Sequence, residues 1–343
     1  MQLNRRSEFV FDLWAVALLV PLVAVPFVTT NALAFSLTNQ VVIGIVAALG
    51  VYIMLRLGLL AFTVPAFMAI GGYAAAILAK SGTTDLALLM AIAFVVPVLL
   101  ALPLGALVLR LKGTYFIFIT YIFNEILQIA FFETPTLTGG ADGITALPPA
   151  TFLGVQLASQ SMLVLVTVVI GVAAALVTFV VTDRFRPEFS SIEENETLAQ
   201  SLGVPVHVYR TIGFVTSAGV SGLAGFALVN QLSTANASSF ASFSAVNYIA
   251  YAFIGGRRTM LGSVIGGVLL ISMSNAFSSQ GQYSTALFGL LLIVCVMIVP
   301  GGIVGGCQRL FITLMGRANG NLKEDVDDQT KGGANDHAKG ERI

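Results

Sequence analysis

Glu125 is the ionisable residue whose surroundings most need a chemical explanation, because it lies within a long apolar run. The run reads YFIFITYIFNEILQIAFF and places Glu125 beside Asn124 and three residues before Gln128. A charged side chain at the centre of a bilayer costs about 2.5–3.5 kcal/mol on insertion scales, so this carboxyl group should face protein or water. Two interpretations stay open: a residue on a solute pathway or gate, or a structural hydrogen bond to a neighbouring helix. No chain of further acids accompanies it, which argues against a proton-driven pump.

A second chemically distinct stretch, SSIEENETLAQSLGVPVHVYR (190–210), is polar and acidic at its start, although its surroundings are apolar. Ser190 or Ser191 could cap a helix, because each has a glutamate three residues further on. Gly203 suits the left-handed position that follows a helix, and Pro205 prevents continuation. The spacing predicts one helix of about 12 residues, roughly 18 Å long, which is too short to cross a bilayer.

This predicted helix carries a narrow apolar stripe, formed by Ile192, Leu198, Ala199 and Leu202. The stripe could pack on another surface. The pattern alone leaves two alternatives, a solvated connector between two spans or a docking helix for a soluble partner.

Several common reaction motifs are absent. The chain contains no GxxxxGK[ST] phosphate loop, so it should not bind ATP in that way, and no HExxH, CxxC or GxSxG motif. The two histidines, His207 and His337, are too few and too far apart for a metal cluster, and Cys295 and Cys307 give no disulfide or zinc framework. We therefore expect no catalytic residues, no metal site, no cofactor and no nucleic-acid partner.

Composition identifies the setting of these residues. Of the 343 residues, 57% are hydrophobic and 10% are charged, against about 25% charged in a soluble domain. The mean hydropathy is +0.91. The sequence therefore predicts a polytopic membrane protein embedded in a lipid bilayer, an all-α bundle of transmembrane helices.

About ten apolar runs are candidate spans, and eight or nine spans are also possible because the run 245–256 is short. It could tilt, re-enter or join its neighbour. A cleaved signal peptide is the alternative for the first run, since Arg5 and Arg6 precede it and Ala32–Ala34 resembles a peptidase site, but we expect a retained helix. The candidate runs are 10–30, 34–55, 59–80, 86–109, 114–132, 161–182, 211–231, 245–256, 262–278 and 284–300.

The distribution of basic residues predicts the orientation. With ten spans and a cytoplasmic N-terminus, all of the 17 Lys and Arg residues except Lys80 fall on the inner side. Both termini and the 183–210 loop should then be cytoplasmic, and the 133–160 loop should face outward. We expect a permease domain over 1–315 that contains this loop, followed by a disordered cytoplasmic tail over 316–343, which lacks the apolar residues needed for a core.

Five ordered segments resemble LivM-type permeases, the membrane subunits of branched-chain amino acid ABC importers. IEENETLAQSLGV (192–204) resembles the cytoplasmic coupling loop of that family, and LRLKGTYFIFITYIFNEIL (109–127) resembles a segment in which Glu125 falls on the family's acid. PTLTGGADGITALP (135–148) resembles the outer loop. The segments 214–228 and 255–270 complete the set, and the likeness runs from about residue 40 to 306.

The resemblance implies a permease subunit of an ATP-binding-cassette importer for branched-chain amino acids or a related small solute, in a bacterial or archaeal plasma (inner) membrane. It implies three kinds of protein partner besides the bilayer: a second, LivH-like permease, two ATP-binding subunits that bind the ATP, and an extracytoplasmic substrate-binding protein. The residues that it places at the ATPase-coupling site are Ser191, Ile192, Glu193, Glu194, Asn195, Leu198, Ala199, Leu202 and Gly203. Those that it places on the translocation path are Glu125, Asn124 and Pro65, and those near a docked binding protein are Thr138, Gly139, Gly140, Asp142 and Gly143.

Three departures from the family pattern affect these expectations. The family usually has a basic residue where Glu193 stands, so docking electrostatics could be altered. GLLAFTVPAF (58–67) replaces a polar stretch, and Arg257 and Arg258 replace small residues. The solute could therefore differ from leucine, isoleucine and valine. The alternative function is a stand-alone secondary transporter or channel, which would need several buried acids or unwound helices for coupling ions.

Overall fold

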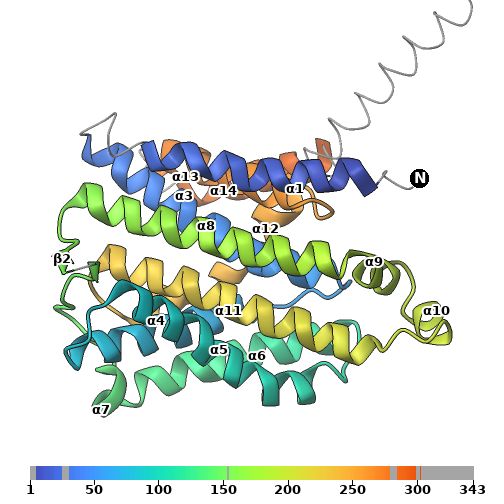
Figure 1. The fold of residues 1–343 in the computed structure, drawn as a ribbon, viewed down its shortest axis with the longest axis horizontal. Coiled ribbons are helices and arrows are strands. Elements are labelled where there is room, and N and C mark those ends of the chain that lie inside the picture. The colour runs from blue at the N-terminus through green and yellow to red at the C-terminus, as the bar shows by residue number, and fades with distance from the viewer. Residues whose placement is uncertain (1–4, 25–30, 153, 279–283, 299–301, 303–343) are drawn as a thin grey trace, which may run out of the picture.

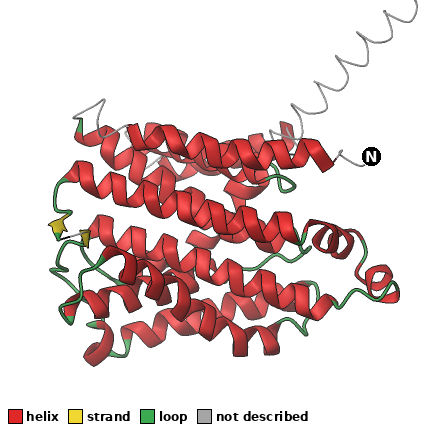
Figure 2. Ribbon diagram, in the orientation of Figure 1, coloured by secondary structure: helices red, strands yellow, loops and turns green. Residues whose placement is uncertain are grey.

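The chain is a bundle of α-helices in a computed structural model that describes residues 5–24, 31–152, 154–278, 284–298 and 302 (Figure 1 and Figure 2). The strands found in this part are β1 (Thr151–Phe152) and β2 (Val155–Gln156), which pair antiparallel with Thr151 opposite Gln156. The predicted all-α class is therefore confirmed. The predicted disordered tail at 316–343 lies outside the described residues.

Among the residues that the structure describes, six helices are long and apolar enough to cross a membrane: α3, α5, α6, α8, α11 and α13. Two shorter apolar stretches, Asp12–Leu22 and Val64–Lys80, accompany them. The helix bounds are α1 Arg5–Leu19, η1 Val20–Ala24, α3 Ala32–Leu55, α4 Val64–Lys80, α5 Leu86–Val108, α6 Thr114–Phe132, α7 Pro135–Thr138, α8 Gln160–Arg184, α9 Arg186–Glu194, α10 Glu196–Ser201, α11 Val206–Leu232, η2 Ala237–Phe240, α12 Ser244–Gly255, α13 Met260–Ser278 and α14 Ser284–Ile298.

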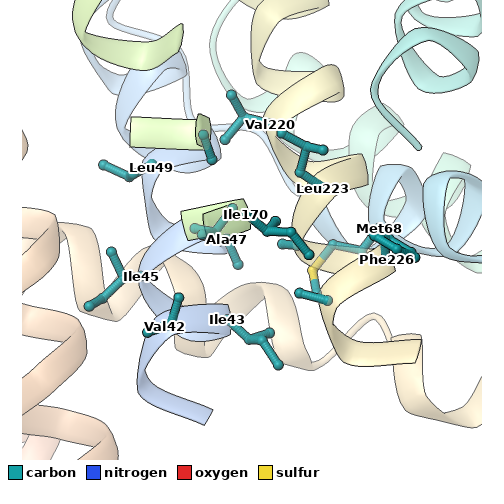
Figure 3. Packing of buried hydrophobic residues seen from close by; sticks show 14 of the residues in the cluster. Val42, Ile43, Ile45, Ala47, Leu49, Met68, Ile170, Val220, Leu223 and Phe226 are labelled. Carbon is teal, nitrogen blue, oxygen red and sulfur yellow. The ribbon is translucent and has the colours of Figure 1, made fainter. Parts of the chain in front are cut away.

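Helices α3 and α11 form the centre of the bundle. Every residue from Val41 to Leu55 and from Thr216 to Ala227 is buried, as expected for helices that are apolar or small on all sides. Figure 3 shows side chains of both helices meeting those of α4 and α8 in one cluster. The Ser217 hydroxyl also donates to the Gly50 carbonyl at 2.7 Å, which ties α11 to α3.

Glycines allow α11 to approach α4 closely. A Cβ atom on Gly225 would overlap the carbonyl oxygen of Met68, and one on Gly71 would overlap the backbone of Gly222. Small residues are the usual means of close helix packing in lipid, where apolar burial drives little association. The glycines of these two helices are therefore explained by packing.

The predicted span 59–80 begins too early, because the helix α4 starts only at Val64. Gly58 has a φ of +69° and ends the turn after α3, and Pro65 occupies the first turn of α4, where its missing N–H is not needed. Residues 59–63 are therefore non-helical, although they are apolar. Hydropathy identifies the apolar run but does not show that its first residues lie outside a helix.

The short run at 245–256 is the helix α12, which pairs with α13 as a helical hairpin. Gly256 has a φ of +129° and closes α12, and a Cβ atom on Gly255 would overlap the backbone of Gly262. The 12 residues of α12 span about 18 Å, so this helix does not cross a bilayer alone.

The two ends of the bundle differ. Helices α9 and α10 lie at one end, whereas α7 and the β1–β2 pair lie at the other (Figure 1). At the α7 end, the Thr151 N–H donates to the Thr84 carbonyl at 2.7 Å, and Ile144 and Ala235 form an antiparallel bridge. The loop 133–160 is thus tied to the segments that follow α4 and α11.

Candidate functional site

The α9–α10 segment consists of two helices, where the sequence had predicted one. Helix α9 runs through Ser190 and Ser191, and the Ser191 hydroxyl donates to the Glu188 carbonyl at 2.8 Å, so the expected serine cap is wrong. The break falls at Asn195, whose φ and ψ are −159° and 103°. Its side-chain oxygen accepts the Leu198 N–H at 3.1 Å and caps α10. Gly203 has a φ of +85°, as predicted for the residue after the helix.

The predicted apolar stripe divides into a buried pair and an exposed pair. Ile192 and Ala199 are 3% and 2% exposed and pack in a cluster with Phe189. Leu198 and Leu202, which lie one turn apart on α10, are 57% and 75% exposed. We call Leu198 and Leu202 the α10 tip, because they are the large apolar side chains that this segment leaves uncovered.

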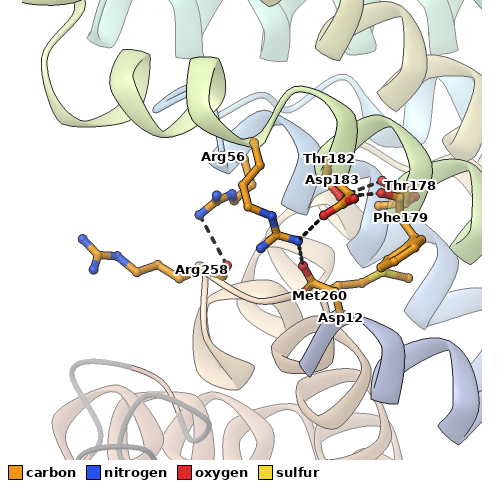
Figure 4. A network of polar contacts seen from close by, with 9 residues as sticks. Asp12, Arg56, Thr178, Phe179, Thr182, Asp183, Arg258 and Met260 are labelled. Atoms are coloured by element: carbon orange, nitrogen blue, oxygen red, sulfur yellow. Dashed lines mark hydrogen bonds and ion pairs between the residues drawn. The ribbon is translucent and has the colours of Figure 1, made fainter. Parts of the chain in front are cut away.

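Glu193 faces the protein's own arginines. Its carboxylate lies 3.7 Å from the Arg56 guanidinium and 3.8 Å from that of Arg257, and its side chain is 11% exposed. Arg56 also donates to the Arg258 carbonyl at 3.4 Å, an approach visible in Figure 4. Two of the departures from the family pattern, the acid at 193 and the base at 257, are therefore paired with each other.

A buried carboxylate that the sequence analysis did not single out anchors α9. Asp12 of α1 is 1% exposed and accepts from the Arg186 guanidinium at 2.7 Å and from the Met260 N–H at 2.8 Å. Arg186 also contacts Asp183 at 3.2 Å (Figure 4). Asp12 thus joins α1, α9 and the start of α13. The sequence signal for this contact was Asp12 itself, the one carboxylate within the first apolar run (10–30).

Glu196 ties α10 to the other side of the bundle. Its two carboxylate oxygens accept from Arg210 of α11 at 3.1 and 3.0 Å, and Lys112, in the loop before α6, lies 3.0 Å away. Burial raises the pKa of Glu196, but the hydrogen bond from Lys112 and the charge of Arg210 outweigh that effect and hold the pKa below its usual value. The carboxylate therefore stays ionised at neutral pH.

The residues expected on a translocation path do not share one surface. Asn124 is 1% exposed and lies on the buried face of α6 with Phe116 and Thr120, and Pro65 is buried in the first turn of α4. Glu125, the next residue of α6, is only half-buried.

Non-helical backbone before α4 contacts this same helix. The Phe62 N–H donates to the Thr120 hydroxyl at 3.2 Å, and the Phe62 ring meets Tyr121 edge-on with centroids 6.0 Å apart. Backbone groups outside a helix at membrane depth need such partners. The segment before α4 is thus fixed against α6 one turn from Glu125.

In the loop 133–160, most residues expected to meet a binding protein serve the loop's own geometry. Thr138 is 1% exposed, and its hydroxyl donates to the Phe131 carbonyl at 2.6 Å. Gly139, Gly140 and Gly143 all have positive φ, which favours glycine. Asp142 is exposed, so its side chain is the one of the five that is free to contact another protein.

Beneath this loop lies a cavity of about 220 Å³. Its lining residues are apolar apart from Asn230 and Ser233, and the Asn230 side-chain amide has a nitrogen without a hydrogen-bond partner. Within the described residues, no group of three or more His, Cys, Asp or Glu side chains could hold a metal ion. Among the described residues, the charged and hydrogen-bonding side chains that could serve a function are therefore concentrated at the α9–α10 end and along α6.

Comparisons with known proteins agree with this architecture. Residues 33–300 match the family described as the permease component of the branched-chain amino acid transport system. The high-affinity branched-chain amino acid transport system permease protein LivM of Salmonella typhimurium is 25% identical over 333 residues, which cover 90% of this chain and 78% of that protein. Its Escherichia coli K12 counterpart is also 25% identical, over 85% of this chain and 74% of that protein. No solved structure gives a significant match. The chain is therefore a multi-pass membrane protein that belongs to the permease family of branched-chain amino acid transport systems.

Proposed function

We propose that this chain is one of two membrane permease subunits of an ATP-binding-cassette importer, and that the importer carries branched-chain amino acids or a related small solute. Family membership supports the class of protein, and the names of the relatives support the class of solute. The observation that carries the mechanism is the α10 tip, where two large apolar side chains remain uncovered on a segment otherwise paired into the bundle.

Other subunits would supply the energy. Two ATP-binding subunits bind and hydrolyse ATP, and one of them docks on the α10 tip, while this chain binds no nucleotide and catalyses no covalent reaction. The α9–α10 end is then cytoplasmic, as are both termini, in a bacterial or archaeal plasma membrane. The basic residues paired at this end support that orientation, because inner loops are rich in Lys and Arg.

Motion of a docked ATPase has a direct route into the bundle. Glu196 begins α10, two residues before Leu198, and it is held by Arg210 at the start of α11, the central helix. Helix α9 is held by Asp12 and Arg56 on the other side. A displacement of the tip would therefore act on α11 while α9 stays in place. The ATPase subunits would drive transport by binding one arrangement of the helices more tightly than the other.

Solute enters from the opposite end. An extracytoplasmic binding protein delivers it near the loop 133–160, where Asp142 is exposed. The path then passes Glu125, beside Asn124, and the segment that precedes Pro65. The contact between Phe62 and Tyr121 supports this course, because it places non-helical backbone one turn from Glu125, and unwound segments commonly line solute paths.

Docking on the α10 tip can be tested by replacing its leucines, whose exposed side chains are not needed to hold α10 in place. Leu198→Asp, in the complete importer, should abolish ATPase recovery on purification and reduce uptake at least tenfold, since it places a charge in the docking surface. Leu202→Asp should act in the same direction. The matched control is Thr197→Asp, which adds the same charge at an exposed position of α10 but removes no apolar contact, and it should retain most activity.

Two results would contradict the proposal. Normal ATPase recovery with both leucine variants would exclude docking on the α10 tip. Solute uptake by the purified chain alone in liposomes, without ATPase subunits, would favour a stand-alone transporter.

A further inference from the structure

Two consecutive helices, α5 and α6, expose much of their surface but differ in chemistry. Both lie at the side of the bundle opposite α1 and α13 (Figure 1). In their most apolar windows, 28% of α5 residues and 17% of α6 residues are buried. Every residue of α5, LALLMAIAFVVPVLLALPLGALV, is apolar, and its exposed large side chains are aliphatic. The exposed surface of α5 is therefore suited to lipid.

The outer surface of α6 includes a polar edge. Tyr121, Glu125 and Gln128 follow one another at spacings of four and three residues, so they lie along one side of the helix. Tyr121 is 39% exposed, and Glu125 and Gln128 are half-buried. The Tyr121 hydroxyl and the Glu125 carboxyl group lie close enough to interact along this side of the helix. We call these three residues the α6 polar edge.

The position of Glu125 makes this edge a poor surface for lipid. It is the twelfth of 19 residues in α6, about 16 Å from the helix start and near the middle of the span. A carboxylate facing hydrocarbon there costs about 2.5–3.5 kcal/mol. The ionisable side chains that the structure describes elsewhere are held at the two ends or, for Asp12, paired within the bundle. Apart from Tyr121 on the same helix, the complementary groups for Glu125 would then come from another membrane chain.

We propose that the α6 polar edge, with Phe62 beside it, is the surface that meets the second permease subunit and forms one wall of the solute path between the two chains. This proposal rests on the proposed function, and it adds which surface of this chain contacts the second permease subunit. The facing helix would offer hydrogen-bond donors to the Glu125 carboxylate. Helix α5 faces lipid in the same assembly.

Site-specific photo-crosslinking in the assembled importer tests this. A benzophenone-bearing amino acid replaces Phe118 or, separately, Ile122, which are 60% and 47% exposed and lie next to the edge. The matched controls carry the same probe at Leu99 or Leu102 of α5, which are 58% and 46% exposed. Irradiated membranes should give an adduct with the second permease from the α6 positions at least tenfold stronger than from α5. Mass spectrometry identifies the attached chain.

The outcomes separate this proposal from the proposed function. An importer that assembles and transports, but whose α6 probes attach only to lipid or to a second copy of this chain, overturns the surface and leaves the proposed function intact. Equal or stronger adducts from α5 also overturn it. Failure of the unmodified chain to recover any second permease or ATPase overturns the proposed function, and the surface with it.

Discussion

Helices α9 and α10 are consecutive in the chain but differ in what their side chains contact. In α9, Arg186 and Glu193 are ion-paired into the bundle, and Ile192 is buried. In α10, Leu198 and Leu202 are exposed, and the link to the bundle is the half-buried Glu196. One helix is thus anchored by the chain itself, whereas the other leaves large apolar side chains exposed.

This difference changes the meaning of Glu193. An acid on a docking surface would alter which ATPase is recognised, but an acid paired with Arg56 and Arg257 alters how α9 is held. The departures from the family pattern at Glu193 and Arg257 can therefore leave a docking surface unchanged, because these two side chains contact each other. The comparison predicts that changes in α9 affect stability, whereas changes at the α10 tip affect assembly with the ATPase.

The largest effect should follow from removing the anchor of α9. Asp12→Ala removes the shorter of the two carboxylate contacts of the buried Arg186 guanidinium and the carboxylate that accepts the Met260 N–H, so it should lower the free energy of unfolding by about 3 kcal/mol. The matched control is Asp183→Ala, which removes the other carboxylate on Arg186. Asp183 is 40% exposed, so its loss should cost about 1 kcal/mol or less. Denaturation of the purified chain in detergent measures both, and equal shifts would show that Asp12 is not the main anchor.

A smaller effect should follow from reversing the charge of Glu193. Glu193→Arg places a third cation beside Arg56 and Arg257, and it should lower the free energy of unfolding by about 2 kcal/mol, between the values for exposed and buried pairs. Arg257→Glu in the same chain should recover part of this loss. ATPase recovery should change little in either variant while the protein remains folded. Loss of ATPase binding at unchanged stability would place Glu193 in the docking surface after all.

Helix positions were largely predictable, because long apolar runs with polar ends leave few alternatives. The predicted span 114–132 coincides with α6, and the run 86–109 begins where α5 begins, after the Asp85 cap, and ends one residue beyond it. The start of α4 was not predictable from hydropathy, because an apolar segment has the same hydropathy whether or not it is helical. Pro65 was the available signal for a later start.

The pairings at the α9–α10 end were not predictable from the sequence. Asp12 and Arg186 are 174 residues apart, and nothing local indicates which of many arginines a buried aspartate will meet. The serine cap failed for a related reason. Pro187 lies in the first turn of α9, so this helix begins before the serines. Asn195 then caps a second helix. These two local signals outweighed the capping-box pattern.

The smallest effect concerns the link between α10 and the bundle, and its sign follows from the pKa of Glu196. Because the folded state lowers this pKa, the ion pairs contribute their full stability above the unfolded-state pKa of about 4.3 and lose it as the pH falls through the folded-state value. The partly exposed geometry suggests a contribution of about 1 kcal/mol. Hydrogen exchange of the α10 amides, corrected for intrinsic rates, should show constant protection from pH 8 to 5 and a decline below pH 4.

The matched variant Glu196→Gln, which is neutral like the protonated acid, should reduce this protection at neutral pH towards the level that the unmodified chain reaches at low pH, and it should remove the decline below pH 4. A decline between pH 7 and 5 in the unmodified chain would contradict the assignment, because the pKa of Glu196 is held below its usual value, which itself lies under that range. Constant protection from pH 7 to 5 would mean that Glu196 remains charged throughout that range. The link between α10 and α11 would then be changed by displacement of the α10 tip and not by protons, which is the behaviour expected of a segment that transmits the motion of a docked protein.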